Sequence, residues 1–233
     1  VKIEGTSLRQ NPADNNYYRM ALSEIEVFAN NLSLAKTVSA SSTEGVGTGW
    51  YKDGLVDGLR WSSAWSSNAS LSVNHTEWAK IDIGGIFPIS LVDLYPRIDA
   101  GNVGQGFPIN FTIQTSTDNV NWTTVISRTA YAQPGNAVQS FPFTTVLARY
   151  IKVEGTSLRA NPGDSNFYRM QLLEIEAYGG SKSLYKKVTA SSSYEAGGWS
   201  AEGAVDSLRS ASGWTSDSTL GSNHTEWITA DMG

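Results

Sequence analysis

The chain contains no cysteine and only two histidines among its 233 residues. Without thiols, this sequence has no disulfide framework and no cysteine-based chemistry. With His75 and His224 as the only imidazoles, the usual nucleophile and base combinations are scarce. We find no His-x-x-x-His metal signature and no phosphate-cradling glycine loop before a helix. The sequence therefore predicts that this segment is not an enzyme, although a catalytic domain can lie elsewhere in a longer chain.

Long apolar runs and clusters of positive charge are also missing. No stretch approaches the roughly 20 apolar residues that a membrane-spanning helix needs, and no charged-then-apolar leader opens the chain. The formal net charge is −5, and lysine and arginine are scattered along the sequence. This distribution argues against nucleic acid as a partner and against electrostatic docking on anionic lipid.

The strongest feature that is present is an internal repeat. Residues 1–26, which begin VKIEGTSLRQNP, are echoed 150 positions later by residues 151–176, which begin IKVEGTSLRANP. A period of this length corresponds to a whole domain rather than to a solenoid repeat. We therefore predict a tandem array. In it, 31–180 form a complete domain, 1–30 are the C-terminal part of a preceding repeat, and 181–233 are the N-terminal part of a following one.

The two flanking pieces do not add up to a second complete domain. Together they lack any counterpart of roughly residues 85–150. Two interpretations stay open. Either the sequence is a fragment of the array, or neighbouring copies exchange elements.

The polar and apolar residues follow the pattern of β-strands throughout. At 110–115, Phe111 and Ile113 alternate with polar residues, which is the period of a half-buried strand, and 150–154 and 173–177 alternate in the same way. Turn residues such as Gly84-Gly85 separate the expected strands. No amphipathic helix exceeds a turn or two, so the sequence predicts an all-β antiparallel sandwich, with a jelly roll as its expected topology. Further strands are expected at 79–83, 89–95, 122–127 and 138–145.

Seven segments of the chain follow one another in the order found in a known domain family. They are 40–42, 56–58, 77–84, 92–97, 111–116, 148–153 and 173–176. This ordered set resembles the discoidin domain, also called the coagulation factor 5/8 type C domain. Among bacterial members, the chain is most similar to the sugar-binding ones grouped as family 32 carbohydrate-binding modules. The resemblance implies a discoidin-like jelly roll and an extracellular protein, either secreted or at the cell surface.

The resemblance also implies a structural Ca²⁺ ion that ties the loop after the first strand to the last strand. Calcium prefers several carboxylate and carbonyl oxygens in a flexible cage. Asp57 and Glu174 match the two family carboxylates. From the residues alone, Asp57 can instead cap a turn and Glu174 can be a solvated strand residue. Carbonyls of Gly54, Leu59 and Leu173 and an oxygen of Ser63 would complete the cage, and Glu24 and Asp206 match the two carboxylates in the flanks.

A sugar site is the second implication of the resemblance. Arg97 and Asn102 match the Arg and Asn with which galactose-type members hold a sugar. Phe167, with Tyr168 next, matches the aromatic that commonly completes that site, and His75 is the only candidate for its histidine. From the residues alone, Arg97 can equally form a salt bridge at a sheet end, to Asp99 or Asp93, and Asn102 can be a turn residue.

The tryptophans fall into two groups. Trp65, Trp78 and Trp122 lie where the family places core or strand-end aromatics, and we expect them in the core. Trp50 and Trp61 lie in Gly- and Ser-rich loops, where a large ring has fewer ways to be buried. We predict that these two form a ligand platform, with cover for the mouth of the sandwich as the alternative.

Together, these expectations describe a non-catalytic carbohydrate-binding module of a secreted, multimodular bacterial protein. It would bind galactose-like glycan ends and target an attached glycoside hydrolase, and tandem copies would add avidity. The main alternative is a structural or adhesive spacer repeat without glycan binding, whose partners are neighbouring repeats. Membrane binding through Trp50 and Trp61 is disfavoured by the acidic balance and the lack of a basic rim.

Overall fold

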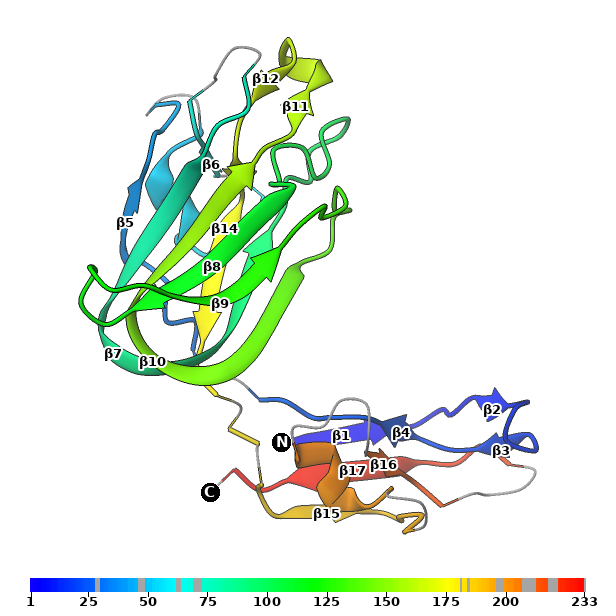
Figure 1. Ribbon diagram of the computed structural model, residues 1–233. Coiled ribbons are helices and arrows are strands. Elements are labelled where there is room, and N and C mark those ends of the chain that lie inside the picture. Colours follow the sequence, from blue (N-terminus) through cyan, green and yellow to red (C-terminus); the bar gives the residue numbers. More distant parts are fainter. Residues whose placement is uncertain are drawn as a thin grey trace. The chain divides into compact units, whose positions relative to one another are not determined.

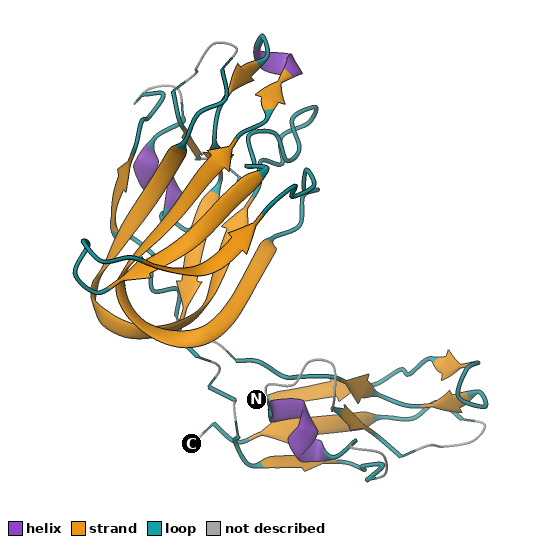
Figure 2. Cartoon of the chain, in the orientation of Figure 1, coloured by secondary structure: helices purple, strands orange, loops and turns teal. Residues whose placement is uncertain are grey.

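The computed structural model describes residues 1–27, 30–45, 49–61, 64–68, 73–180, 182–183, 185–195, 199–206, 213–217 and 222–232. They divide into two compact units (Figure 1). The larger unit is Asn30–Gly180, and the smaller one combines Val1–Ala29 with Ser181–Gly233. Strands and loops dominate both units, and the helical pieces drawn in Figure 2 are short 3-10 turns. Within the described part of the chain, no helix is long and apolar enough to span a bilayer.

The larger unit is built on two long antiparallel strands, β7 (Glu77–Tyr95) and β10 (Gln139–Ser157). Both bend sharply, as Figure 1 shows, so each contributes to two layers. The first half of β7 pairs with β5 (Thr37–Ala40), and the second half pairs with β14 (Glu174–Tyr178). The second half of β10 continues to β8 (Asn110–Ser116) and β9 (Thr123–Arg128). The expected all-β antiparallel sandwich is confirmed.

The predicted break at Gly84-Gly85 is wrong, because β7 runs through both residues. Gly84 has φ = +86°, a conformation that glycine adopts without steric cost, so the strand bends here instead of ending. In the same way, the strands expected at 138–145 and 150–154 are parts of one strand, β10, whose pairing register with β7 shifts between Pro142 and Val146.

The core lies between the two layers. Trp65 is fully buried as expected, and its indole N–H donates to the carbonyl oxygen of Ser42 at 3.0 Å. The core prediction is wrong for Trp78 and Trp122, which are half-buried with Lys80 and Lys152 over their rings. Trp78 lies on the opposite face of β7 from the buried Ala79 and Ile81 side, since strand residues alternate between faces. An aromatic cluster fills one end of the core: Phe107, Phe111, Tyr131 and Phe141.

Several short elements gather at one end of the larger unit, where the labels β6, β11 and β12 stand in Figure 1. Strand β6 (Trp65–Ser66) pairs with β13 (Gln171–Leu172). Strand β11 (Ala160–Asn161) pairs with β12 (Phe167–Tyr168) in a hairpin. The remaining pieces are the 3-10 turns η1 (Lys52–Leu55) and η2 (Pro162–Asp164).

In the smaller unit, the two flanking pieces of the chain pack against each other. Its main sheet has the order β1 (Lys2–Gly5), β17 (Glu226–Ala230), β15 (Val188–Ala190). The pairing of β1 with β17 repeats that of β10 with β7 at the matching residues. Trp214 and Ile228 are fully buried in its core. The tandem-array interpretation stays a prediction. The other elements are β2 (Gln10–Asn11), β3 (Tyr17–Tyr18), β4 (Ala21–Leu22), β16 (Trp214–Thr215) and η3 (Ala201–Val205).

Candidate functional site

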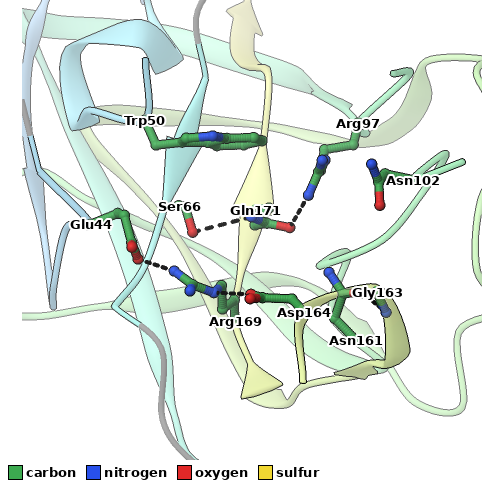
Figure 3. A pocket seen from close by; sticks show the side chains of 10 residues that line it. All are labelled: Glu44, Trp50, Ser66, Arg97, Asn102, Asn161, Gly163, Asp164, Arg169 and Gln171. Carbon is green, nitrogen blue, oxygen red and sulfur yellow. Dashed lines mark hydrogen bonds and ion pairs between the residues drawn. The ribbon is translucent and has the colours of Figure 1, made fainter. Parts of the chain in front are cut away.

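A pocket of about 350 Å³ opens in the larger unit, at the end where the short elements β6, β11 and β12 lie (Figure 3). In Figure 3 the ring of Trp50 lies on one side of it, and the side chains of Arg169 and Asp164 lie on the other. Its lining is mainly polar and contains charges of both signs. The lining residues are Glu44, Trp50, Ser66, Arg97, Asn102, Asn161, Gly163, Asp164, Arg169 and Gln171.

Arg97 follows the end of β7 and has a largely buried side chain, 11% exposed. Its Nε and Nη2 donate to the carboxylate of Asp99 at 2.8 and 2.6 Å, and its Nη1 donates to Gln171 Oε1 at 2.9 Å. The guanidinium carbon lies 4.7 Å from the ring centroid of Trp50, within cation–π range. The hydrogen bonds from Arg97 hold the pKa of Asp99 below its ordinary value. Arg97 thus forms the alternative salt bridge to Asp99 and also lines the pocket.

The loop after Arg97 is held by backbone hydrogen bonds. Gly104 N–H donates to the carbonyl oxygen of Arg97 at 2.8 Å, and Asn102 N–H donates to that of Asp99 at 2.9 Å. Gly104 has φ = +70°, and a Cβ there would lie 2.0 Å from the carbonyl oxygen of Pro134. Only glycine fits this position, because any side chain would overlap the backbone. Asn102 Nδ2 also donates to Asp99 at 2.7 Å, so Asn102 is a loop residue and a pocket residue at once.

Arg169 supplies the second guanidinium of the pocket and lies between two carboxylates. Its Nε donates to Asp164 at 2.5 Å, and its Nη1 donates to Glu44. Asp164 belongs to η2, which Asn161 caps by accepting a hydrogen bond from Gly163 N–H at 3.0 Å. The pocket therefore offers two planar donor groups, several carboxylate oxygens and one indole ring. Planar donors match neighbouring hydroxyls, and an indole face matches the apolar side of a sugar ring.

A second polar site surrounds the start of β14. Glu174 is fully buried, one of its oxygens accepts from Gly58 N–H at 3.2 Å, and the other, Oε2, is buried without a hydrogen-bond partner. Burial raises the pKa of Glu174 to about 8, and the charges of nearby Asp57 and Glu176 add to the rise. An unpaired buried carboxylate oxygen is costly, so these residues fit a bound cation, which would compensate for it.

The other cage residues predicted for calcium lie in the adjoining segments. Asp57 Oδ1 accepts from Leu59 N–H at 2.8 Å, so Asp57 does cap a turn. For Glu174 the solvated alternative is wrong, because the side chain is fully buried. Gly54 is a buried residue of η1, and Leu173 directly precedes β14, while Ser63 lies outside the described residues. Within the described segments, no three Asp, Glu or His side chains form a metal cluster, so a cation here depends on backbone carbonyls as well.

Next to this site, Glu176 accepts three hydrogen bonds. They come from Arg60 Nη2 at 2.6 Å, Tyr95 Oη at 2.6 Å and Tyr178 Oη at 2.7 Å. Burial and Glu176 raise the pKa of both tyrosines above their ordinary values. The guanidinium of Arg60 also lies 4.4 Å from the ring centroid of Tyr95. This network fastens the loop that follows Asp57 to β14.

The sequence comparison identifies the family. The family model described as the F5/8 type C domain matches residues 37–170, which is more than half of the chain. The chain belongs to the F5/8 type C domain family. A search of curated proteins found no match.

The solved structures that are similar to this chain include chitosan-binding modules and a lectin domain. Chitosan-binding module 1 of a chitosanase/glucanase from Paenibacillus sp. IK-5 is 30% identical over 65% of this chain and 100% of the module, with a TM-score of 0.51. Module 2 of the same enzyme, solved with chitotriose, is 29% identical over 64% and 100%, with a TM-score of 0.51. The lectin domain of lectinolysin, solved with Lewis B antigen, is 25% identical over 66% and 100%, with a TM-score of 0.52.

Of the predicted sugar contacts, Trp50, Arg97 and Asn102 come together in the pocket, and the other four lie outside its lining. The ring of Phe167 packs beside the guanidinium of Arg169, with 6.0 Å between centroid and guanidinium carbon. Tyr168 packs against the core.

His75 and Trp61 are also separate from the pocket lining. The ring nitrogens of His75 lie 3.1 Å from the carbonyl oxygen of Val73 and 3.0 Å from Glu77 Oε1. Glu77 also accepts from Ser41 and Ser42, so the histidine belongs to a cluster that joins β7 to the end of β5. Trp61 is 73% exposed.

Seven residues that line the pocket were not predicted from the sequence. For two of them, Asp164 and Arg169, the internal repeat contains a pattern that could have indicated an ion pair. The five-residue spacing of Asp164 and Arg169 recurs as Asp14 and Arg19, which form the same ion pair at 2.5 Å. The others required knowledge of which loops meet. The seven are Glu44, Ser66, Asn161, Gly163, Asp164, Arg169 and Gln171.

Proposed function

We propose that the pocket of the larger unit binds the end of a glycan chain, and that this protein is a non-catalytic carbohydrate-binding module. The observation that carries the proposal is that Trp50, Arg97 and Asn102 line one pocket. A planar guanidinium, a side-chain amide and an indole are the groups that recognise sugar hydroxyls and the apolar face of a sugar ring. Relatives that are 25–30% identical carry chitosan-binding or lectin names, which supports the same class of ligand.

We propose galactose-like glycan ends as the first ligand class. Arg97 and Asn102 lie five positions apart on one loop and share Asp99 as a partner, so their donors are held together. Such a pair suits two neighbouring hydroxyls of one sugar.

A cationic amino sugar is the second candidate class. Glu44 and Asp164 place two carboxylates in the pocket, and each hydrogen bond to Arg169 uses one carboxylate oxygen. A protonated amine pairs favourably with carboxylates in such a setting. The chitosan-binding names of two relatives support including this class in any test.

A glycan array probed with the full 233-residue chain tests the proposal. We expect binding to galactose-terminated or glucosamine-containing glycans, and Arg97→Ala should abolish it. The matched control is Arg149→Ala, because Arg149 pairs with Asp82 on the sheet, outside the pocket lining. If the folded wild-type chain binds no glycan, the spacer-repeat alternative replaces the proposal.

The biological setting is part of the proposal. An extracellular location and an attached glycoside hydrolase, which the module would bring to its polysaccharide, are supported by relatives that come from a chitosanase/glucanase. Binding of several neighbouring modules to one polysaccharide would raise the overall affinity.

We also propose a structural Ca²⁺ ion at the start of β14. Asp57 and Glu174 would hold it, together with backbone carbonyls of Gly54, Leu59 and Leu173. The buried, unpaired Oε2 of Glu174 is the observation that supports this site. A divalent cation there would neutralise the buried carboxylate and tie the loop that follows η1 to the closing strand.

A further inference from the structure

Gln171 is a buried polar side chain between two walls of the pocket, as Figure 3 shows. It is only 4% exposed. Its Oε1 accepts from Arg97 Nη1 at 2.9 Å, and its Nε2 donates to Ser66 Oγ at 3.2 Å. Its backbone N–H donates to the carbonyl oxygen of Gly106 at 2.9 Å. Gln171 belongs to β13, and its hydrogen bonds therefore link this strand both to the loop that carries Arg97 and to strand β6.

The hydrogen bond to Gln171 is the described side-chain hydrogen bond that joins Arg97 to a strand of the sandwich. The other side-chain hydrogen bonds described for Arg97 go to Asp99, which is 51% exposed and lies two residues along the same loop. That pair lies within one loop, so it does not tie the guanidinium of Arg97 to a strand. The bond to Gln171, in contrast, crosses to a strand in the core of the unit.

The side chain of Gln171 has little room to move. A Cβ on Gly106 would lie 2.5 Å from Gln171 Cβ and 2.8 Å from its Oε1, so the loop backbone packs directly on the glutamine. Close packing of this kind fixes a side chain in one rotamer. Gln171 thus presents its acceptor oxygen to Arg97 in one direction.

Comparison of the two units distinguishes what the Gln171 side chain contributes from what its strand, β13, contributes. Ala21 occupies the matching position in the smaller unit, and β4 pairs with β16 there as β13 pairs with β6. The strand pair therefore forms with alanine at this position. What glutamine adds is its pair of hydrogen bonds to Arg97 and Ser66.

We propose that Gln171 is a positioning residue of the glycan site, which sets the affinity for sugar by holding the guanidinium of Arg97 beneath Trp50. The inference rests on the proposed function of the pocket. Hydrogen bonds to a charged group in a buried setting are stronger than those between neutral groups. Without the hydrogen bond to Gln171, the described side-chain hydrogen bonds of Arg97 go only to Asp99, which is exposed.

The test compares Gln171→Ala with Gln171→Glu in the full chain, by calorimetric titration with lactose and with chitotriose. Alanine copies Ala21, and glutamate keeps an acceptor for Arg97. We expect Gln171→Ala to lose roughly tenfold or more in affinity, and Gln171→Glu to stay within about threefold of wild type. Equal affinities for Gln171→Ala and wild type would overturn the inference.

A spectroscopic readout keeps the inference separate from the proposed function. The Nε–H resonance of Arg97, assigned with an Arg97→Lys spectrum, should shift or broaden in Gln171→Ala, while that of Arg149 stays in place. If the wild type binds neither sugar, the glycan role falls with the proposed function, and the positioning of Arg97 is judged by this signal alone. An unchanged Arg97 resonance would overturn it.

Discussion

At the scale of single residues, the pocket contains two guanidinium groups that are held in place by hydrogen bonds to other side chains. Arg97 is fixed by Asp99 and Gln171, and Arg169 by Asp164 and Glu44. Because these donors are already oriented, a ligand does not have to pay the entropy of ordering them. The aromatic side of the pocket, in contrast, is formed by one lining residue, Trp50.

Trp50 and Trp61 form a matched pair for testing that side of the pocket. Both were predicted as ligand platforms, but Trp50 lines the pocket and Trp61 is 73% exposed in a loop outside its lining. We expect Trp50→Ala to weaken glycan binding by about tenfold, because it removes the ring that a sugar would contact. Trp61→Ala should stay within about twofold of wild type. Titration with the best array ligand measures both, and an equal loss for Trp61→Ala would contradict this assignment.

Removal of calcium tests the cage around Glu174. We expect the melting temperature of the wild-type chain to be higher in calcium than in chelator, since a ligand that binds only the folded state stabilises it. Glu174→Gln removes a carboxylate ligand and also the ionisable group, whose burial disfavours its charged form and raises its pKa to about 8. It should therefore lose the calcium response and melt above the wild type in chelator.

The control for this experiment is Glu154→Gln, a carboxylate on β10 that pairs with Lys152 away from the cage. It should keep the full calcium response. Differential scanning calorimetry in calcium and in chelator measures all three proteins. A calcium response that survives in Glu174→Gln would contradict the proposed cage.

At the scale of elements, the pocket is built where short strands and loops end, above a frame of two long strands. Strands β7 and β10 form this frame, and the loop after β7 carries Arg97 to the end of the unit where β6 and β11 lie (Figure 1). Strand β13 pairs with β6 at this end. Rigid strands with functional loops at one end are a common way to position a binding site. The shape of that loop therefore decides the geometry of the site.

Two glycines of this loop provide a matched test. Gly104 and Gly101 both have positive φ, +70° and +84°, so alanine is strained at either position. A Cβ at Gly104 would lie 2.0 Å from the carbonyl oxygen of Pro134, whereas nothing lies within 4 Å of one at Gly101. We expect Gly104→Ala to destabilise the fold more than Gly101→Ala, which should cost about 1–2 kcal/mol. Urea unfolding measures the difference, and equal costs would contradict the loop geometry.

At the scale of the whole molecule, the two units share repeated sequence segments, but the pocket with Trp50, Arg97 and Asn102 is described only in the larger unit. Arg97 and Asn102 belong to the segment near residues 85–150 that has no counterpart in the flanking pieces. In the smaller unit, Arg19 matches Arg169, and Tyr194 matches Glu44. The guanidinium carbon of Arg19 lies 4.7 Å from the ring centroid of Tyr194. Its polar groups therefore differ from those of the pocket.

This difference predicts the stoichiometry of binding. We expect one glycan site per chain, because the smaller unit lacks the planar donors of the Arg97 loop. Calorimetric titration with a short oligosaccharide should give a molar ratio near one, and Arg97→Ala should remove all of it. A ratio of two, or residual binding in Arg97→Ala, would assign a site to the smaller unit.

The sequence by itself determined the fold class, because strand alternation and turn residues are local patterns that survive without tertiary context. The all-β antiparallel sandwich is confirmed, and Arg97, Asn102 and Trp50, singled out in the sequence, meet in the pocket. The local pattern failed where backbone conformation mattered: it predicts a turn at Gly84-Gly85, but the strand β7 continues through both residues and bends there.

Only the tertiary structure decided which distant residues share the site. Gln171, Arg169 and Glu44 come from segments up to 127 positions apart, and their roles follow from hydrogen bonds across loops. The same holds for Phe167 and His75, whose residue types suit a sugar site but whose side chains contact Arg169 and Glu77 instead. Residue type and spacing report local structure, whereas the convergence of loops depends on how the two layers pack, and the linear pattern does not contain that information.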